Sequence, residues 1–200
     1  MRSRAAAAIL TREGFKEVYS MEGGIQAWKG LRAAGAPEAG MAYFDPAKTP
    51  EELIALAWML EEGSSEFYQE MSKMKAPGAM TLFRELAADE EKHKSSLFKA
   101  YEKFTPNKPD PGFPRSLVSL EPGVDYLEGG IVLNKALEWA RGKDLKEVLE
   151  FSISLEVNAV DLYIKMERRV GGKESKEAFQ GLSNQERNHL QRLTAAREKN

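Results

Sequence analysis

Apolar residues return every three or four positions over four long stretches of this chain. The stretches cover about residues 50–73, 79–104, 145–170 and 173–198. This spacing is typical of amphipathic helices that bury one face against a shared core. At about 1.5 Å per residue, each predicted helix is roughly 38 Å long.

Capping and helix-breaking residues mark where these stretches begin and end. Thr49, followed by Pro50, and Asp144 are residues of the kind that cap the first turn of a helix. Short breaks occur at Ala76-Pro77-Gly78 and at Gly171-Gly172. The first and second helices, and the third and fourth, are therefore predicted to be joined by short turns.

The segment from Thr105 to Gly142 has a different character. It holds five of the nine prolines and leaves room for one short helix near residues 132–141. Four helices joined by a short, a long and a short connection are the pattern of ferritin-like bundles. We therefore predict a mainly α fold, a ferritin-like four-helix bundle with one long crossover.

The beginning of the chain does not continue the bundle pattern. An alanine-rich helix over residues 2–13 precedes a β-like run from Phe15 to Met21, and a second helix begins after Gly24. Periodicity is lost over residues 34–48. We predict a small N-terminal α/β fragment over residues 1–39, a linker over 40–48 and the bundle over 49–198.

Composition and charge exclude several kinds of site. The chain has no cysteine, which excludes disulfides, thiolate metal sites, iron–sulfur clusters and a cysteine nucleophile. A net charge of -2 gives no field that attracts nucleic acid or anionic lipid. No apolar run approaches the roughly 20 residues that a membrane-spanning helix needs. We expect a cytoplasmic protein with no nucleic-acid partner and no membrane partner.

The first and third predicted helices share a sequence pattern, and so do the second and fourth. The matching positions are Leu60, Glu61, Tyr68 and Met71 with Leu155, Glu156, Tyr163 and Met166, and Phe83, Glu90, His93 and Leu97 with Phe179, Glu186, His189 and Leu193. The spacing is the same at every named position. We interpret the two halves as a duplicated helix pair.

The repeated acidic and histidine positions form a candidate metal site. A Glu and a His three residues apart share one helix face, and apolar neighbours direct that face toward the core, where unpaired charge is costly. Four carboxylates and two imidazoles match the di-iron or di-manganese arrangement of helical bundles. The candidate ligands are Glu61, Glu90, His93, Glu156, Glu186 and His189. The alternative is that these residues are solvated or structural. Chance places a Glu before both histidines only roughly once in sixty.

Two tyrosines accompany the candidate ligands. Tyr68 and Tyr163 each follow a ligand glutamate by seven residues, which is nearly two turns of a helix. We predict that they donate hydrogen bonds to Glu186 or Glu90, with simple packing as the alternative. Glu66 lies about 140° around the helix from the ligand stripe and is expected to be solvated or structural.

With these motifs, residues 49–198 resemble the rubrerythrin family, whose helices carry a Glu followed by Tyr seven residues later and a Glu-x-x-His pair. The resemblance implies a di-iron oxidase or peroxidase that acts on O₂ or hydrogen peroxide. The chain departs from the family pattern at Ala159, where rubrerythrins carry an additional glutamate ligand, and Ser64 occupies the corresponding position of the first helix. No rubredoxin module is present, so the resemblance implies an external electron-donor protein.

Residues 1–39 resemble the C-terminal part of a rhodanese domain. The resemblance rests on Arg2-Ser3, Gly14-Phe15-x-x-Val18, Glu22-Gly23-Gly24-Ile25-x-x-Trp28 and Gly35-x-Pro37. In that family a nucleophilic cysteine precedes the Arg-Ser pair, which here would fall upstream of Met1. We therefore expect no sulfurtransferase activity from this chain.

Three functional hypotheses follow from the sequence. The first is a rubrerythrin-type redox protein with two iron ions, for which manganese or zinc are alternative metals. The second is a non-catalytic iron-binding or iron-handling protein. The third is an interaction module in a sulfur-relay system. The oligomeric state stays open, with a homodimer as one alternative.

Overall fold

The computed structural model describes residues 49–105, 110–118 and 123–199. The chain divides into two units, Met1–Tyr43 and Phe44–Asn200, and all described residues belong to the second unit. The predicted α/β fragment, the linker and the rhodanese-like motifs over residues 1–48 lie outside the described residues.

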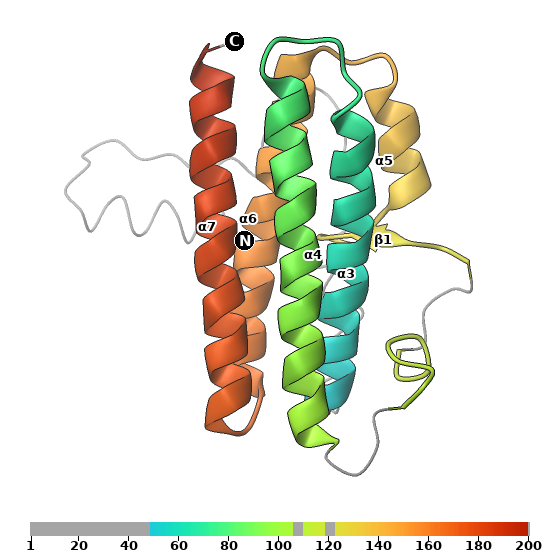
Figure 1. Ribbon diagram of the computed structural model, residues 1–200, viewed down its shortest axis with the longest axis vertical. Coiled ribbons are helices and arrows are strands. Elements are labelled where there is room, and N and C mark those ends of the chain that lie inside the picture. The colour runs from blue at the N-terminus through green and yellow to red at the C-terminus, as the bar shows by residue number, and fades with distance from the viewer. Residues whose placement is uncertain (1–48, 106–109, 119–122, 200) are drawn as a thin grey trace, which may run out of the picture. The chain divides into compact units, whose positions relative to one another are not determined.

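Four long helices build the second unit (Figure 1). They are α3 (Pro50–Met71), α4 (Ala79–Phe104), α6 (Leu145–Arg169) and α7 (Lys173–Lys199). Each end lies within two residues of its predicted position. The predicted mainly α fold, a ferritin-like helical bundle, is confirmed.

Capping boxes fix the starts of α3 and α6. Thr49 accepts a hydrogen bond from the backbone N–H of Glu52, whose carboxylate accepts one from the backbone N–H of Thr49 at 2.9 Å. Asp144 and Glu147 make the same reciprocal pair at the start of α6. These contacts satisfy backbone donors that have no partner inside the helix. Twelve residues after each cap, α3 and α6 present Glu61 and Glu156.

The two helix pairs point in opposite directions. The short turn between α3 and α4 lies at one end of the bundle, and the turn between α6 and α7 lies at the other (Figure 1). Within each pair the two helices pack closely along their length, and α4 also packs against α7. Because α4 ends at the end opposite to the start of α6, the crossover has to run the length of the bundle.

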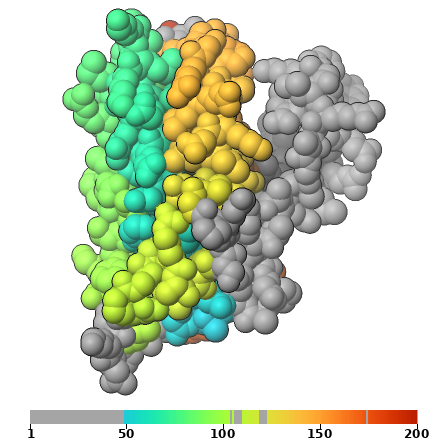
Figure 2. All heavy atoms as spheres, turned by 90° about the vertical axis from the view of Figure 1, so that its right-hand side faces the viewer, coloured from blue at the N-terminus to red at the C-terminus, as the bar shows by residue number. Residues whose placement is uncertain are grey.

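The described part of the crossover contains a small hairpin and one short helix. Strand β1 (Tyr126–Leu127) pairs in antiparallel fashion with β2 (Ile131–Val132), and α5 (Leu133–Ala140) follows directly. The short helix was predicted and the hairpin was not. Both β1 and α5 contact α3. Figure 2 shows the crossover spread over the face of the bundle that contains α3.

Matching aromatic pairs from the two halves form part of the core. Tyr68 stacks on Phe83 with ring centroids 5.9 Å apart, and Tyr163 stacks on Phe179 at 6.1 Å. All four side chains are buried. Since the interplanar angles are 18° and 26°, the sequence repeat is also a repeat of packing geometry.

Over the described residues, none of the helices contains an apolar stretch long enough to cross a membrane.

Candidate metal centre

The six candidate ligands meet in the middle of the bundle, although they come from four helices. Glu61 lies on α3 and Glu156 on α6, while α4 and α7 each supply a Glu and a His. None of the six residues is more than 3% exposed: Glu61, Glu90, His93, Glu156, Glu186 and His189. The duplicated helix pair therefore brings all six together, far from solvent.

The six residues form two overlapping groups that could each hold one metal ion. The first contains Glu61, Glu90, His93 and Glu186, and the second contains Glu90, Glu156, Glu186 and His189. In each group, one potential ligand atom from every residue lies within 4.8 Å of the others. Glu90 and Glu186 belong to both groups, so their carboxylates are placed to bridge two ions.

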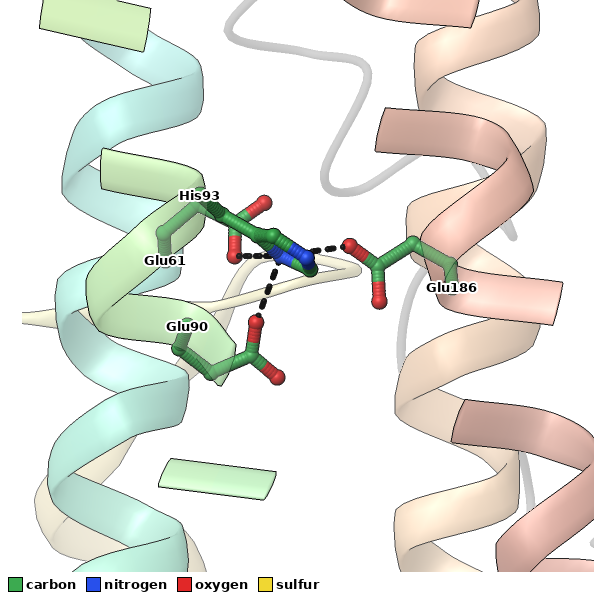
Figure 3. Close-up of side chains that lie close together, drawn as sticks. All are labelled: Glu61, Glu90, His93 and Glu186. Carbon is green, nitrogen blue, oxygen red and sulfur yellow. Dashed lines mark hydrogen bonds and ion pairs between the residues drawn. The ribbon is translucent and has the colours of Figure 1, made fainter. Parts of the chain in front are cut away.

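The surroundings of each imidazole suit a shared cation. Nδ1 of His93 lies 2.8 Å from Glu90, 3.0 Å from Glu186 and 3.1 Å from Glu61 (Figure 3). One ring nitrogen carries at most one proton, so it cannot donate a full hydrogen bond to three carboxylates. His189 mirrors this arrangement, with Nδ1 at 2.9 Å from Glu186. The two rings stack with their centroids 5.2 Å apart.

Several polar atoms of the cluster lie close to one another but have no partner in hydrogen-bonding geometry. They are Oε2 of Glu90, Nε2 of His93, both carboxylate oxygens of Glu186 and Nδ1 of His189. Buried polar atoms are nearly always hydrogen-bonded in folded proteins. Carboxylate oxygens and imidazole nitrogens are also the donors that iron and manganese accept. The residues present therefore fit a pair of metal ions.

Burial and mutual repulsion shift the proton affinities of the bridging carboxylates. Burial raises the pKa of Glu90 and Glu186 well above the ordinary 4.5, and neighbouring glutamates raise it further. Burial opposes protonation of His93 and His189, but the surrounding carboxylates outweigh it and raise both pKa values above 6.5. Burial also acts to raise the pKa of Glu61, yet His93 holds it below 4.5.

Each tyrosine hydroxyl donates to a candidate ligand glutamate of the other half. Tyr68 on α3 donates to Glu156 on α6, and Tyr163 on α6 donates to Glu61 on α3. The predicted acceptors, Glu186 and Glu90, are therefore wrong. The reason is geometric, because α3 and α6 run antiparallel (Figure 1). Seven residues span about 10 Å, so a tyrosine that far along one helix reaches the glutamate of its antiparallel neighbour.

Three further positions from the sequence analysis are Glu66, Ser64 and Ala159, and none of them contributes a carboxylate to the cluster. Glu66 is exposed on α3, outside the cluster. Ser64 and Ala159 are both buried at 2% exposure, one turn after Glu61 and Glu156. Neither adds a carboxylate to the cluster from its own helix.

A seventh buried carboxylate was missed by the sequence analysis. Glu128 lies in the turn between β1 and β2, is only 3% exposed and accepts a hydrogen bond from Oγ of Ser64. Burial raises its pKa well above 4.5, and the charges of Glu61 and Glu156 add to that effect. The following Gly129-Gly130 pair signals a tight turn, but nothing in the local pattern shows that the turn faces the core.

Comparison with known proteins points in the same direction as this geometry. Residues 52–141 match the family model described as rubrerythrin. The matched range includes Glu61, Glu90, His93 and the crossover carboxylate Glu128. The match agrees with the ferritin-like fold, and with the buried Glu/His cluster it indicates a metal-binding site.

A solved structure of a hypothetical protein from Pyrococcus furiosus is similar to this chain. The two are 29% identical, and the similarity covers 82% of this chain and 95% of that chain with a TM-score of 0.58. No curated protein matches. The structural similarity therefore extends well beyond the residues that the family model matches.

Proposed function

We propose that this chain is a rubrerythrin-type redox protein whose bundle holds two iron ions between its four helices. The observation that carries the proposal is the pair of overlapping ligand groups, which share Glu90 and Glu186. Hydrogen peroxide or O₂ is the proposed oxidant. The electrons come from an external donor protein, because the chain contains no cysteine to hold a second iron centre.

Charge and ligand type support iron as the metal. Four carboxylates balance two divalent cations, and the oxygen and imidazole donors suit iron and manganese. These donors do not exclude zinc. The match of residues 52–141 to rubrerythrins favours iron among the three.

A bound iron pair would supply electrons and open coordination positions for the oxidant. The chain's own residues orient the ligands and keep out water. Tyr68 and Tyr163 hold the two non-bridging glutamates in place through their hydroxyl groups. The stacked Phe83 and Phe179 rings back these tyrosines, so each hydroxyl is fixed by packing as well as by its hydrogen bond.

Anaerobic titration with ferrous iron tests the metal pair. We expect saturation near two equivalents per chain, and saturation at one equivalent or none would contradict the proposal. Glu61→Ala and Glu156→Ala should each weaken one of the two binding events. Glu66→Ala is the matched control on α3, because Glu66 is exposed outside the cluster. Loss of binding in that control would show that the ligand assignment on α3 is wrong.

Turnover separates a redox enzyme from an iron-handling protein with the same ligands. With a reducing donor in excess, we expect the iron-loaded protein to consume peroxide or O₂ over many cycles. A single stoichiometric oxidation followed by retention or release of ferric iron would favour iron handling. The measurement is oxidant consumption per iron pair, by stopped flow and in the steady state, after anaerobically reduced protein is mixed with the oxidant.

A further inference from the structure

We propose that Glu128 is a seventh metal ligand, a carboxylate that the crossover hairpin delivers to the side of the cluster formed by Glu61 and Glu156. The inference rests on the proposed metal pair. It concerns a residue outside the helix motifs and outside the two four-residue groups.

Glu128 is buried without a compensating positive charge. It is 3% exposed, and no basic side chain among the described residues forms an ion pair with it. Its hydrogen-bond donors are neutral: the hydroxyl of Ser64 and the backbone N–H of Glu128 itself. A buried carboxylate with only neutral donors is costly, and still more so where Glu61 and Glu156 carry like charge nearby. A cation at the centre removes that cost.

Two glycines seat the hairpin against the ligand-bearing helices. A Cβ added at Gly63 of α3 would lie 2.3 Å from the carbonyl oxygen of Tyr126 in β1, so only glycine lets the strand approach this closely. On the other side, Gly129 has φ +84°, and an added Cβ would lie 2.4 Å from Nδ2 of Asn158 on α6. Glu128 lies between these two contacts, next to the helices that carry Glu61 and Glu156.

The side chains one turn after Glu61 and Glu156 are small, which leaves space for a carboxylate from the crossover. Ser64 follows Glu61 by three residues, and Ala159 follows Glu156 by three. Neither side chain is large enough to reach the cluster itself. Ser64 instead holds the Glu128 carboxylate, and rotation about the Glu128 side-chain bonds would exchange that hydroxyl for a metal ion.

The first test removes the negative charge of the Glu128 side chain while keeping its shape. Glu128→Gln can still accept from Ser64, so a purely structural role would leave metal binding unchanged. We expect affinity for one of the two ions to fall by about 10-fold or more, and the absorption spectrum of the cobalt-substituted protein to change. Glu66→Gln is the matched control, because it removes the same charge from an exposed position on α3. Unchanged affinity and an unchanged cobalt spectrum in Glu128→Gln would overturn the proposal.

The second test needs no variant. In a crystal structure of the cobalt- or zinc-loaded parent protein, a Glu128 oxygen should lie about 2.0–2.2 Å from an ion. A loaded structure in which Glu128 still contacts Ser64 and no ion would refute its role as a ligand. If the parent binds fewer than two ions, the proposed metal pair fails instead. If it binds two ions without Glu128, only the present inference fails.

Discussion

At the scale of single residues, protons and metal ions compete for the same buried atoms. The raised pKa values of Glu90, Glu186, His93 and His189 mean that these groups hold protons more tightly in the metal-free folded protein than in the unfolded chain. Metal ions must displace those protons before they can bind. Metal binding should therefore release protons and tighten as pH rises.

The same shifts predict how the stability of the metal-free protein depends on pH. A group with a raised folded-state pKa stabilises the fold below its unfolded pKa, and that stability is lost as pH rises through the folded pKa. For the bridging glutamates the loss begins above 4.5, and for the histidines above 6.5. The lowered pKa values of Glu61, Asp89 and Glu91 act in the opposite direction, but the groups with raised pKa values are more numerous and mostly more deeply buried.

We therefore expect the melting temperature of chelator-treated protein to fall between about pH 5 and about pH 9. The increase in melting temperature caused by added metal should grow over the same range. Thermal unfolding followed by circular dichroism, with and without metal, measures both trends. A melting temperature of the metal-free protein that rises with pH would contradict the assigned directions of the pKa shifts.

Residue spacing predicted the candidate ligands on the helices, but it could not predict the acceptors of the tyrosines or the place of Glu128. Glu90 and His93 share a face of α4 because an interval of three residues fixes direction on a helix. The acceptors of the tyrosines depend instead on which helix lies opposite, and the spacing within one helix does not contain that information. Glu128 has no matching residue in the other half of the repeat, because the crossover occurs only once. Contacts of the hairpin with α3 and α6 place its turn against the core, and the local sequence does not show those contacts.

At the scale of elements, the contact between α3 and the crossover hairpin depends on the missing side chain of Gly63. Two effects of Gly63→Ala oppose each other. Alanine in a helix interior is favoured over glycine by up to about 1 kcal/mol. The added Cβ, however, would meet backbone atoms of Tyr126 at 2.3 and 2.9 Å, which forces the hairpin away.

We expect the clash to dominate, so that Gly63→Ala lowers the free energy of unfolding by about 1–3 kcal/mol. Gly181→Ala on α7 is the matched control, because no heavy atom lies within 4 Å of its added Cβ. That control should be neutral or stabilising by up to about 1 kcal/mol. Urea denaturation of both variants measures the difference. Equal stabilisation by both would show that the hairpin does not pack tightly on α3.

The ends of the elements were predictable where capping residues mark them. Thr49 and Asp144 each form a capping box, and the predicted starts of α3 and α6 are confirmed. The strands β1 and β2 were not predicted, because each is only two residues long and is stabilised by the helices beside it.

At the scale of the whole molecule, the repeat predicts a nearly symmetric bundle. Tyr68 donates to Glu156 and Tyr163 donates to Glu61, so each helix pair holds a candidate ligand of the other in place. The crossover breaks this symmetry, because its hairpin and Glu128 have no equivalent in the second half. The four-helix fold could be predicted from the lengths of the loops. The asymmetry caused by the crossover hairpin could be recognised only in the three-dimensional structure.

The opposite orientation of the two helix pairs limits how the bundle can be circularly permuted. If the bundle without residues 1–48 is opened in the crossover before β1, a linker must join the end of α7 to the start of α3, at opposite ends of the bundle (Figure 1). A helix of 25 residues spans about 38 Å, so an extended linker needs at least about 12 residues.

A permutant with a linker of about 20 residues should therefore be a monomer that binds two ions. With about five residues the chain cannot close on itself, and we expect two chains to exchange helix pairs as a domain-swapped dimer. Light scattering combined with metal analysis measures both states, and a monomeric short-linker permutant would contradict the antiparallel arrangement of the pairs.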